Sequence, residues 1–587
     1  MSGTAKSRAE KRGRRGDGAT AAAAGRAKGR HAPGAGRRRQ LLPAVLRRPP
    51  TWAVALALAL LHLVLALAVF DPTVFTGGDN AAYLSLAHSL LERHSYTTIW
   101  EPLQPAHTQY PPVFPAMIAL GLLLGVKSWV GIKLIVVLCS TAAVALTYLW
   151  LRRRRRPALA LGVGLLVALS PGVLALSHQE LSDVPFWALA MLALWAFERL
   201  GRRERLRLAL GVAAVVLAYF TRSAGLPLVL AALAWLAWRR RWRQLAILAG
   251  VIVPLAFLWW LRGKLTGGSV YAQLFWYVDP YRPAAGTIGI TELFHRVFAN
   301  ERAYLGSALP ILLAEQAQPL LVFISYVVAL LAIFGWVVRL RRPQVAEFFF
   351  PLYVGLLLVW PEVWAGERFL LPAYPLLLAY AGDGASRLLR RFERRAVAPL
   401  GFAAAVLLAL IAIPALRSDA SAGSLCREEF ISGNGMACLD TPWQDFFEIA
   451  AWSRGSLPRD AAVFSRKPRL FYVYSGRTGL DVPRTQDPKE FLKEAQANRI
   501  DHVLVDRLGG LTLEYFGPIF TAHPDAFCLV QATGDGGAAL LRMQPNAAAL
   551  LAGPPHPMSP RAGVARCEAP PAAHAGGATA PPPAASR

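Results

Sequence analysis

Three acidic residues lie at the ends of apolar runs, where a carboxylate can take part in acid–base chemistry. Asp79 stands in the motif G-G-D-N-A-A-Y, shortly after the apolar run that ends at Phe70. Glu180 and Asp183 stand three residues apart in H-Q-E-L-S-D-V-P-F-W, at the start of a later apolar run. Partial desolvation at a membrane boundary raises the proton affinity of a carboxylate and suits it to the role of a general base. We therefore predict Asp79 as a catalytic base and take Asp183 and Glu180 as further candidate carboxylates.

Each of these sites also has a purely structural interpretation. The residues G-G-D-N precede A-A-Y-L-S-L-A-H, a pattern typical of the start of an amphipathic helix, so Asp79 could cap that helix. Ser182 or Asp183, just ahead of Pro185, would cap a helix in the same way. For Asp79 taken alone, the two interpretations are equally well supported.

Two arginines at the ends of other apolar runs are candidates for holding a phosphate group. They are Arg222 in Y-F-T-R-S-A-G and Arg368 in G-E-R-F-L-L-P, where Glu367 is the preceding residue. A phosphate that leaves as an anion is stabilised by positive charge more than by a strong general acid. A lone arginine at a helix end can instead extend to lipid headgroups. We take Arg222, Glu367 and Arg368 as candidate substrate-binding residues.

Aromatic residues near Asp79 complete the set of candidate substrate contacts. Tyr83 would suit stacking on a sugar, although aromatic residues are expected at a membrane interface in any case. Tyr110, in the segment Q-Y-P-P-V-F-P, is a further candidate. The sequence requires no metal ion or other cofactor, and a divalent cation beside Asp79 or Asp183 is an alternative that no motif supports. The histidines nearest these acids match no compact metal-binding spacing: His88, His94, His107 and His178.

The elements that must position these side chains are membrane helices. The chain has 587 residues, of which 55% are hydrophobic and 17% charged, so it is too apolar for several water-soluble domains. Runs of roughly 20 apolar residues, enough to span a bilayer, recur from Thr51 to about Leu416. Val113–Val126 is short for a full span, which predicts a re-entrant or surface-lying helix. We predict a polytopic α-helical membrane domain over residues 51–416 with about eleven crossings, near 51–70, 130–151, 157–176, 183–200, 206–221, 224–239, 243–261, 319–340, 345–361, 368–384 and 396–416.

The distribution of positive charge predicts the orientation of these helices. The net charge is +27, and residues 1–50 hold fourteen lysines and arginines against two acidic residues. Such a disordered basic tail before a first span is typical of a cytoplasmic anchor that contacts membrane lipid, and less so of a nucleic-acid-binding segment. Asp79, Asp183 and Arg368 would consequently emerge in one cleft at the outer face of the cytoplasmic membrane. The arginine-rich joints that would be cytoplasmic are 152–156, 198–207, 239–243, 339–342 and 387–395.

Beyond Arg417 the composition changes to that of a water-soluble domain. Apolar runs at Ala461–Ser465, Leu470–Gly476 and His502–Asp506 are typical of buried strands, and F-L-K-E-A-Q-A between them is typical of a helix. We predict a small extracytoplasmic α/β domain over residues 417–552. Residues 553–587 are rich in proline and alanine, which predicts a disordered tail.

Four of the five cysteines lie in this outer part of the chain. Cys426 and Cys438 are close in sequence and would pair in an oxidising compartment. Cys528 and Cys567 would provide a second pair, although the sequence leaves the connectivity open. Cys139 lies within a predicted span, which favours an inert buried thiol.

The order of the motifs resembles that in GT-C glycosyltransferases, in the branch of the protein O-mannosyltransferases and the lipid A aminoarabinose transferases. The motifs are G-G-D-N-A-A-Y, Q-Y-P-P-V-F-P, H-Q-E-L-S-D-V-P-F-W and E-R-F-L-L-P-A-Y-P, all between Trp52 and Leu416. The resemblance implies a GT-C-like bundle and the inverting transfer of a sugar from a polyprenyl-phosphate donor. It also implies that Asp79 and Asp183 are the two acidic residues of the family pattern and that Arg368 is its basic residue.

The chain departs from this pattern at one position. Some relatives carry a lysine just before the first proline-rich segment, where this sequence has Gln109 and Tyr110. Neither of these side chains is positively charged at neutral pH. The sequence therefore lacks the cation that would be expected to contact the phosphate at this position. The arginines become the better candidates for that contact.

Three functions remain open at this point. The resemblance favours transfer of a sugar to a glycan, lipid or protein acceptor. An O-antigen ligase-like or polymerase-like enzyme would instead use a diphosphate-linked glycan and depend on arginines of a large outer loop, such as Arg262, Lys264, Arg282, Arg296 and Arg302. A non-enzymatic transporter of lipid-linked glycans would place ionisable residues in the middle of its spans and show internal symmetry, whereas the acids here lie at helix ends.

Overall fold

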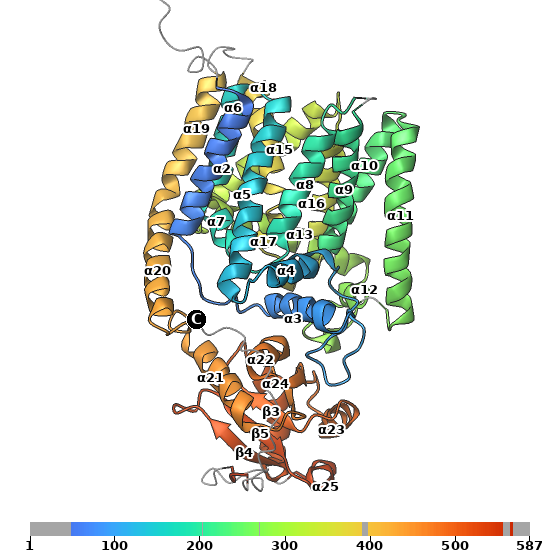
Figure 1. Ribbon diagram of the computed structural model, residues 1–587, viewed down its shortest axis with the longest axis vertical. Helices are drawn as coiled ribbons and strands as arrows, with labels where there is room; N and C mark the ends of the chain where they lie inside the picture. Colours follow the sequence, from blue (N-terminus) through green and yellow to red (C-terminus); the bar gives the residue numbers. More distant parts are fainter. Residues whose placement is uncertain (1–48, 202–203, 269, 390–396, 556–563, 568–587) are drawn as a thin grey trace, which may run out of the picture. The chain divides into compact units, whose positions relative to one another are not determined.

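The apolar runs of the sequence form a bundle of long helices, followed by a small domain that contains a sheet (Figure 1). The computed structural model describes residues 49–201, 204–268, 270–389, 397–555 and 564–567. The chain divides into the units Met1–Pro49 and Pro50–Arg587, and the second unit holds every element described here. The predicted basic tail, residues 1–50, lies outside the described residues except for Pro49 and Pro50.

Each predicted crossing contains a helix. Proline residues start several of them, because a proline in the first turn loses no helical hydrogen bond. Pro171 starts α7 directly after α6, and the two helices are bent by 55° at this break. The bundle helices are α2 (Thr51–Ala68), α5 (Trp129–Arg154), α6 (Pro157–Leu169), α7 (Pro171–Ser177), α8 (Asp183–Phe197), α9 (Arg205–Thr221), α10 (Leu226–Trp238), α11 (Trp242–Leu265), α15 (Pro319–Arg339), α16 (Val345–Val359), α18 (Tyr374–Leu389) and α19 (Val397–Ile411).

The lengths of these helices identify a multi-pass integral membrane protein. Among the described residues, five helical segments are long and apolar enough to cross a membrane, and the bent pair α6 and α7 would add a sixth. Several other predicted crossings fall on apolar helices of 10–17 residues. The count of eleven crossings therefore stays a prediction. The five long segments are Thr51–Ala68, Trp129–Arg154, Trp242–Leu265, Pro319–Arg339 and Val406–Ile431.

Two short helices run across the long ones (Figure 1). Helix α3 (Asp79–Glu92) follows Gly78, whose φ of 92° lies in the left-handed region that glycine adopts without strain. Helix α4 (Val113–Leu123) packs against α3, α5 and α9. Its 11 residues extend only about 16 Å, which is too short to cross a membrane. The predicted short helix at Val113–Val126 therefore exists.

Buried ion pairs join the arginine-rich joints at one end of the bundle. A buried charge is tolerated only when it is paired, so these contacts hold the helix ends together. They connect the end of α5 with α8, α15, α16 and α18. The pairs are Arg154 with Glu198 and Glu347, and Asp383 with Arg155 and Arg339.

The carboxyl-terminal domain contains a mixed sheet. In the described residues it has five strands in the order β2-β1-β3-β5-β4. The strand β1 pairs in parallel with β2 and β3, and β5 pairs antiparallel with β3 and β4. The strands are β1 (Ala462–Phe464), β2 (Thr478–Leu480), β3 (His502–Val505), β4 (Phe527–Ala532) and β5 (Ala539–Met543). The helices around them are α21 (Thr441–Ser456), α22 (Pro468–Ser475), α23 (Pro488–Ala497), α24 (Leu511–Ala522) and α25 (Ala547–Ala552). Helix α20 (Ile413–Ile431), which precedes them, contacts α2 and α19 of the bundle.

One predicted strand is a helix. Leu470–Gly476 was expected to be extended, but it forms most of α22. Pro468 occupies the first turn of this helix, where its fixed φ favours a helix start. The buried positions are 468, 470, 471 and 475; the series 468, 471 and 475 has helical spacing, and two adjacent buried residues do not fit the alternation of a half-buried strand. The expected strands at Ala461–Ser465 and His502–Asp506 are present as β1 and β3.

Two disulfides close this domain. Cys426 pairs with Cys438, and Cys528 pairs with Cys567. The second disulfide returns the chain to the sheet, where Arg566 forms a parallel bridge with Leu529 of β4. The predicted disordered tail 553–587 therefore contains a short ordered segment at 564–567, because the disulfide and the strand pairing anchor it. Within the described residues Cys139 is a free cysteine.

Candidate active site

Asp79 is surrounded by hydrogen-bond donors and positive charges. The Tyr110 hydroxyl donates to Asp79 Oδ1 over 2.7 Å. Arg368 Nη1 lies 3.2 Å from Asp79 Oδ2, and Arg469 Nη1 lies 3.7 Å from Asp79 Oδ1. The capping interpretation does not hold, because Gly78 occupies the N-cap position of α3 and no side chain caps the helix. The side chain of Asp79 is 25% exposed, so water and small groups reach it.

These contacts lower the pKa of Asp79 below its ordinary value. Burial by itself would raise this pKa, but the charges of Arg368 and Arg469 and the hydrogen bond from Tyr110 outweigh burial. The sequence-based expectation of a raised proton affinity is therefore wrong for this arrangement. Asp79 is therefore ionised more readily, and it is a weaker base than an unpaired aspartate.

Asp183 pairs with Arg222. Asp183 Oδ2 lies 2.6 Å from Arg222 Nη1, and its side chain is almost fully buried at the start of α8. Arg222 Nη1 also donates to Ser182 Oγ over 3.1 Å, and that hydroxyl is 3.0 Å from the hydroxyl of Tyr83. Ser182 is the N-cap residue of α8, yet its side chain makes no capping hydrogen bond. Asp183 and Ser182 therefore orient Arg222 and do not cap the helix.

A short helix connects the two acidic positions. Helix α17 (Glu367–Leu370) carries Phe369, whose ring lies 4.6 Å from the guanidinium of Arg368 and 5.3 Å from that of Arg222. The Tyr353 hydroxyl donates to the Phe369 carbonyl over 2.9 Å, which ties α17 to α16. The two arginines therefore share one aromatic ring, and both acids belong to one group of side chains. We call Asp79, Asp183, Arg222, Arg368 and Arg469 the arginine–carboxylate cluster.

Two predicted site residues lie apart from this cluster. Glu180 is fully buried in the loop before α8, where its Oε1 lies 3.6 Å from Lys133 Nζ of α5 and its Oε2 accepts from the Phe75 amide over 3.3 Å. It shares no helix face with Asp183, because α8 begins only at Asp183. Among the described residues, Glu367 makes no hydrogen bond or ion pair with a member of the cluster. The structure gives neither residue a contact with Asp79.

Arg469 is a member of the cluster that the sequence analysis missed. It stands in the first turn of α22, in the carboxyl-terminal domain. Arg469 Nη1 donates to the Tyr110 hydroxyl over 2.8 Å, and Nη2 donates to Gln109 Oε1 over 3.2 Å. The segment R-K-P-R at 466–469 was the available signal. Its proline is typical of a helix start, and the arginine that follows would then lie in the first turn of that helix. The strand prediction for Leu470–Gly476 concealed this signal.

A second basic residue of the same turn contacts the loop before α3. Lys467 Nζ donates to the Gly77 carbonyl over 2.9 Å. Burial, together with the neighbouring Arg466, lowers the pKa of Lys467 to about 8. Its charge at neutral pH is consequently less secure than that of an arginine.

The histidines form no metal site in the described part of the chain. No group of three or more histidine, cysteine, aspartate or glutamate side chains is arranged there to hold a metal ion. His107 Nε2 accepts from the Tyr110 amide over 2.8 Å, and its ring stacks on that of Tyr110 at 5.2 Å. His107 therefore supports the segment that carries Tyr110.

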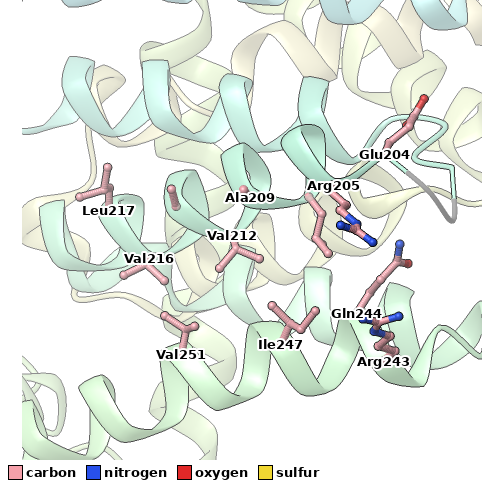
Figure 2. Close-up of a pocket in the computed structure, with 12 residues that line it drawn as sticks. Glu204, Arg205, Ala209, Val212, Val216, Leu217, Arg243, Gln244, Ile247 and Val251 are labelled. Carbon is pink, nitrogen blue, oxygen red and sulfur yellow. The ribbon is translucent and has the colours of Figure 1, made fainter.

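A separate cavity of about 690 Å³ lies between α9 and α11 (Figure 2). Its wall is largely apolar, and the polar residues Glu204, Arg205, Arg243 and Gln244 gather at one end. None of the cluster residues lines it. The cavity is therefore not the site of the chemistry argued from Asp79.

The middle of the membrane domain matches a known family. Residues 109–261 match the family described as dolichyl-phosphate-mannose-protein mannosyltransferase. This segment is similar to members of that family. It begins at Gln109 and includes Glu180, Asp183 and Arg222, so it holds one of the two acids of the cluster. None of the curated proteins matches the sequence.

Two solved structures have a similar fold. The oligosaccharyltransferase of Archaeoglobus fulgidus, solved with a tethered acceptor peptide, is 13% identical with a TM-score of 0.53, covering 86% of this chain and 75% of that one. ArnT from Cupriavidus metallidurans in the apo state is 14% identical with a TM-score of 0.52, covering 86% of this chain and 98% of that one. At these identities the likeness concerns the fold, and it confirms the expected helical membrane protein with a small carboxyl-terminal domain.

Proposed function

We propose that this chain is an integral-membrane inverting glycosyltransferase that moves a sugar from a polyprenyl-phosphate donor to a glycan, lipid or protein acceptor. The observation that carries the proposal is the meeting of Asp79 and Asp183 with three arginines in one cluster. Inverting transfer needs a carboxylate near the acceptor and positive charge near the leaving phosphate, and the cluster offers both. The description of the matching family, which names a dolichyl-phosphate-linked sugar, supports the same class of donor.

The reaction follows from the chemistry of the cluster. The oxygen of an acceptor hydroxyl attacks the anomeric carbon of the sugar, and the bond from that carbon to the phosphate oxygen breaks. The electron pair of this bond leaves with the polyprenyl phosphate, whose charge Arg368 and Arg222 stabilise. The hydroxyl proton goes to Asp79. Because the phosphate takes over the guanidinium contacts, Asp79 loses part of the pairing that lowers its pKa and becomes a better base.

The remaining predicted residues have supporting roles in this proposal. Asp183 orients Arg222 through the 2.6 Å ion pair. Tyr83 reaches Arg222 through Ser182, and Tyr110 holds Asp79 Oδ1. Glu180 pairs with Lys133 and serves packing, which argues against the catalytic role predicted from its spacing.

We also propose that the cluster faces the outer side of the cytoplasmic membrane. Two disulfides in the carboxyl-terminal domain favour an oxidising compartment for that domain. Three of the arginine-rich joints, which the positive-inside rule places in the cytoplasm, are connected by ion pairs: Arg154 pairs with Glu198, and Asp383 pairs with both Arg155 and Arg339. An odd number of crossings, eleven in this proposal, would place the two chain ends on opposite sides.

The contacts of the outer loop argue against a ligase-like enzyme. Arg262 donates to the carbonyls of Tyr96 and His107, and Arg296 donates to those of Phe275 and Tyr277. These guanidinium groups satisfy backbone carbonyls and do not converge on one place where a diphosphate would bind. The acids of the cluster lie at helix ends, which disfavours the transporter alternative.

The test compares sugar transfer by the wild type and Asp79→Asn. Membranes that contain each protein are incubated with radiolabelled polyprenyl-phosphate sugars, and label in the acceptor fraction is counted. Loss of the base should reduce transfer by about 10²- to 10⁴-fold. Glu92→Gln, an exposed carboxylate on the same helix α3, is the matched control and should retain transfer.

Two outcomes would contradict the proposal. Unchanged transfer by Asp79→Asn would remove Asp79 as the base. Wild-type membranes that transfer no sugar from any monophosphate donor, but do so from a diphosphate-linked glycan, would favour the ligase-like alternative.

A further inference from the structure

The carboxyl-terminal domain reaches into the arginine–carboxylate cluster through the side chain of Arg469. Arg469, in the first turn of α22, contacts Asp79, Tyr110 and Gln109, which belong to two different segments of the membrane domain. Its guanidinium also lies 5.5 Å from the ring centres of Trp100 and Tyr110. The side chain remains 25% exposed, so it is held in place without being sealed from a ligand.

Several other contacts fix the position of this domain. Lys467 donates to the Gly77 carbonyl, and the Gly479 amide donates to the Trp100 carbonyl over 2.8 Å. Arg282 of the outer loop pairs with Glu514 of α24 at 3.0 Å. Arg469 is therefore placed by a docked domain, and the ion pair to Asp79 is one of several contacts and not the only attachment.

The cluster holds more positive than negative charge. Three guanidinium groups, from Arg222, Arg368 and Arg469, face two carboxylates, from Asp79 and Asp183. A sugar phosphodiester carries one negative charge, and the phosphate monoester that leaves carries nearly two at neutral pH. The surplus guanidinium therefore matches the donor, and it matches the leaving group more strongly.

Arg469 also supplies positive charge at the place where the sequence departs from the family pattern, beside Gln109 and Tyr110. These two neutral residues stand where a cation was expected before the proline-rich segment. Arg469 donates to both of them and so brings a positive charge to the same place from another domain. A guanidinium offers two parallel donors to a phosphate, which suits this task.

We propose that Arg469 is a ligand of the donor phosphate and that the carboxyl-terminal domain thereby completes the catalytic site. This inference rests on the proposed function and names a substrate contact of the same site. The domain is then a part of the enzyme's active centre. A role confined to presenting the acceptor would not require Arg469 at this position.

The test measures binding of a short polyprenyl monophosphate, farnesyl phosphate, to the purified full-length protein in nanodiscs by calorimetry. Arg469→Ala should weaken binding by about 10- to 100-fold, the loss expected for a charge-assisted contact. Arg469→Lys keeps the charge but not the paired donors, so its affinity for farnesyl phosphate should lie between those of the wild type and Arg469→Ala. Arg282→Ala is the control, because Arg282 also contacts the carboxyl-terminal domain but does not contact Asp79. Its affinity for farnesyl phosphate should stay within about 3-fold of the wild-type affinity.

The outcomes separate this inference from the proposed function. If the wild type binds farnesyl phosphate and Arg469→Ala binds it equally well, the role of Arg469 is wrong while the proposed function stands. If the wild type neither binds farnesyl phosphate nor transfers sugar from a monophosphate donor, the proposed function itself fails. Hydrogen exchange of α22 monitors domain docking in each variant. If Arg469→Ala loosens α22, the Arg469→Lys variant provides the decisive measurement. An Arg469→Lys variant whose α22 stays protected from hydrogen exchange, and which binds farnesyl phosphate as tightly as the wild type, would refute the paired guanidinium contact.

Discussion

At the residue scale, the chemistry of this site depends on which anion the arginines hold. Asp79 shares Arg368 and Arg469 with the phosphate that we propose, and a guanidinium cannot pair fully with both. In the mechanism that we propose, Asp79 is therefore a weak base while it is paired and a stronger one when a phosphate enters. Binding of the donor would therefore itself make Asp79 a stronger base.

This competition predicts a shift in the pH profile. Asp79 must be ionised to act as a base, so transfer is present above its pKa and is lost as the pH falls through it. The charges of Arg368 and Arg469 lower that pKa, and Arg469→Ala removes one of them. The acid limb of kcat/KM should consequently move to higher pH in Arg469→Ala. The charged and titratable groups near Asp79 are Arg222, Arg368, Arg469, Lys467, Tyr83, Tyr110 and Tyr271.

The measurement is the pH dependence of kcat/KM for the donor in wild type and variant. Arg282→Ala serves as the control, because its side chain lies on the exposed contact with Glu514. An acid limb at the same pH in wild type and Arg469→Ala would show that another group controls it.

At the element scale, helices α15 and α18 leave no room for a side chain between their backbones at two glycine positions. Helices α15 and α18 pack so closely that a Cβ at Gly335 would lie 1.9 Å from the Tyr380 carbonyl oxygen. Gly384 faces the Leu331 carbonyl in the same way, at 2.2 Å. Backbone atoms cannot move aside as a flexible side chain can. The pair matters for the site because α18 follows directly after α17, which carries Arg368 and Phe369.

Gly335→Ala should therefore destabilise the protein. The added methyl group forces α15 and α18 apart, which should cost about 1–3 kcal/mol in the free energy of unfolding. Thermal unfolding in detergent measures this as a lower Tm. Gly355→Ala in α16 is the matched control, because its Cβ would meet no atom within 4 Å and alanine is the better helix former. Equal Tm values for the two variants would contradict the close packing.

At the scale of the whole molecule, two parts of the chain build one site. The membrane domain supplies Asp79, Asp183, Arg222 and Arg368, and the carboxyl-terminal domain supplies Arg469. This arrangement requires the domain and the cluster to lie on the same side of the membrane. The arginine-rich joints should lie on the other side.

Labelling of single cysteines tests this orientation. In a Cys139→Ser background, Leu513→Cys places a thiol on exposed α24, and Arg341→Cys places one in the joint between α15 and α16. A membrane-impermeant maleimide should label Leu513→Cys in intact cells and Arg341→Cys only after lysis. Labelling of both, or the reverse pattern, would contradict the proposed orientation.

The sequence predicted the helices well because burial in a bilayer leaves a strong local signal. Runs of apolar residues, proline at helix starts and arginine at the joints are readable without any partner. The motifs around Asp79, Asp183 and Arg368 were local too, and the structure brings these residues together.

What the sequence by itself determined was the class of protein, its membrane helices and four of the five members of the cluster. Only the tertiary structure decided that Arg469 joins them, that Glu180 pairs with Lys133 instead, and that the pKa of Asp79 is lowered. The reason is physical. Helix formation and membrane insertion depend on neighbouring residues, whereas a carboxylate's partners and proton affinity depend on charges brought near it from distant parts of the chain.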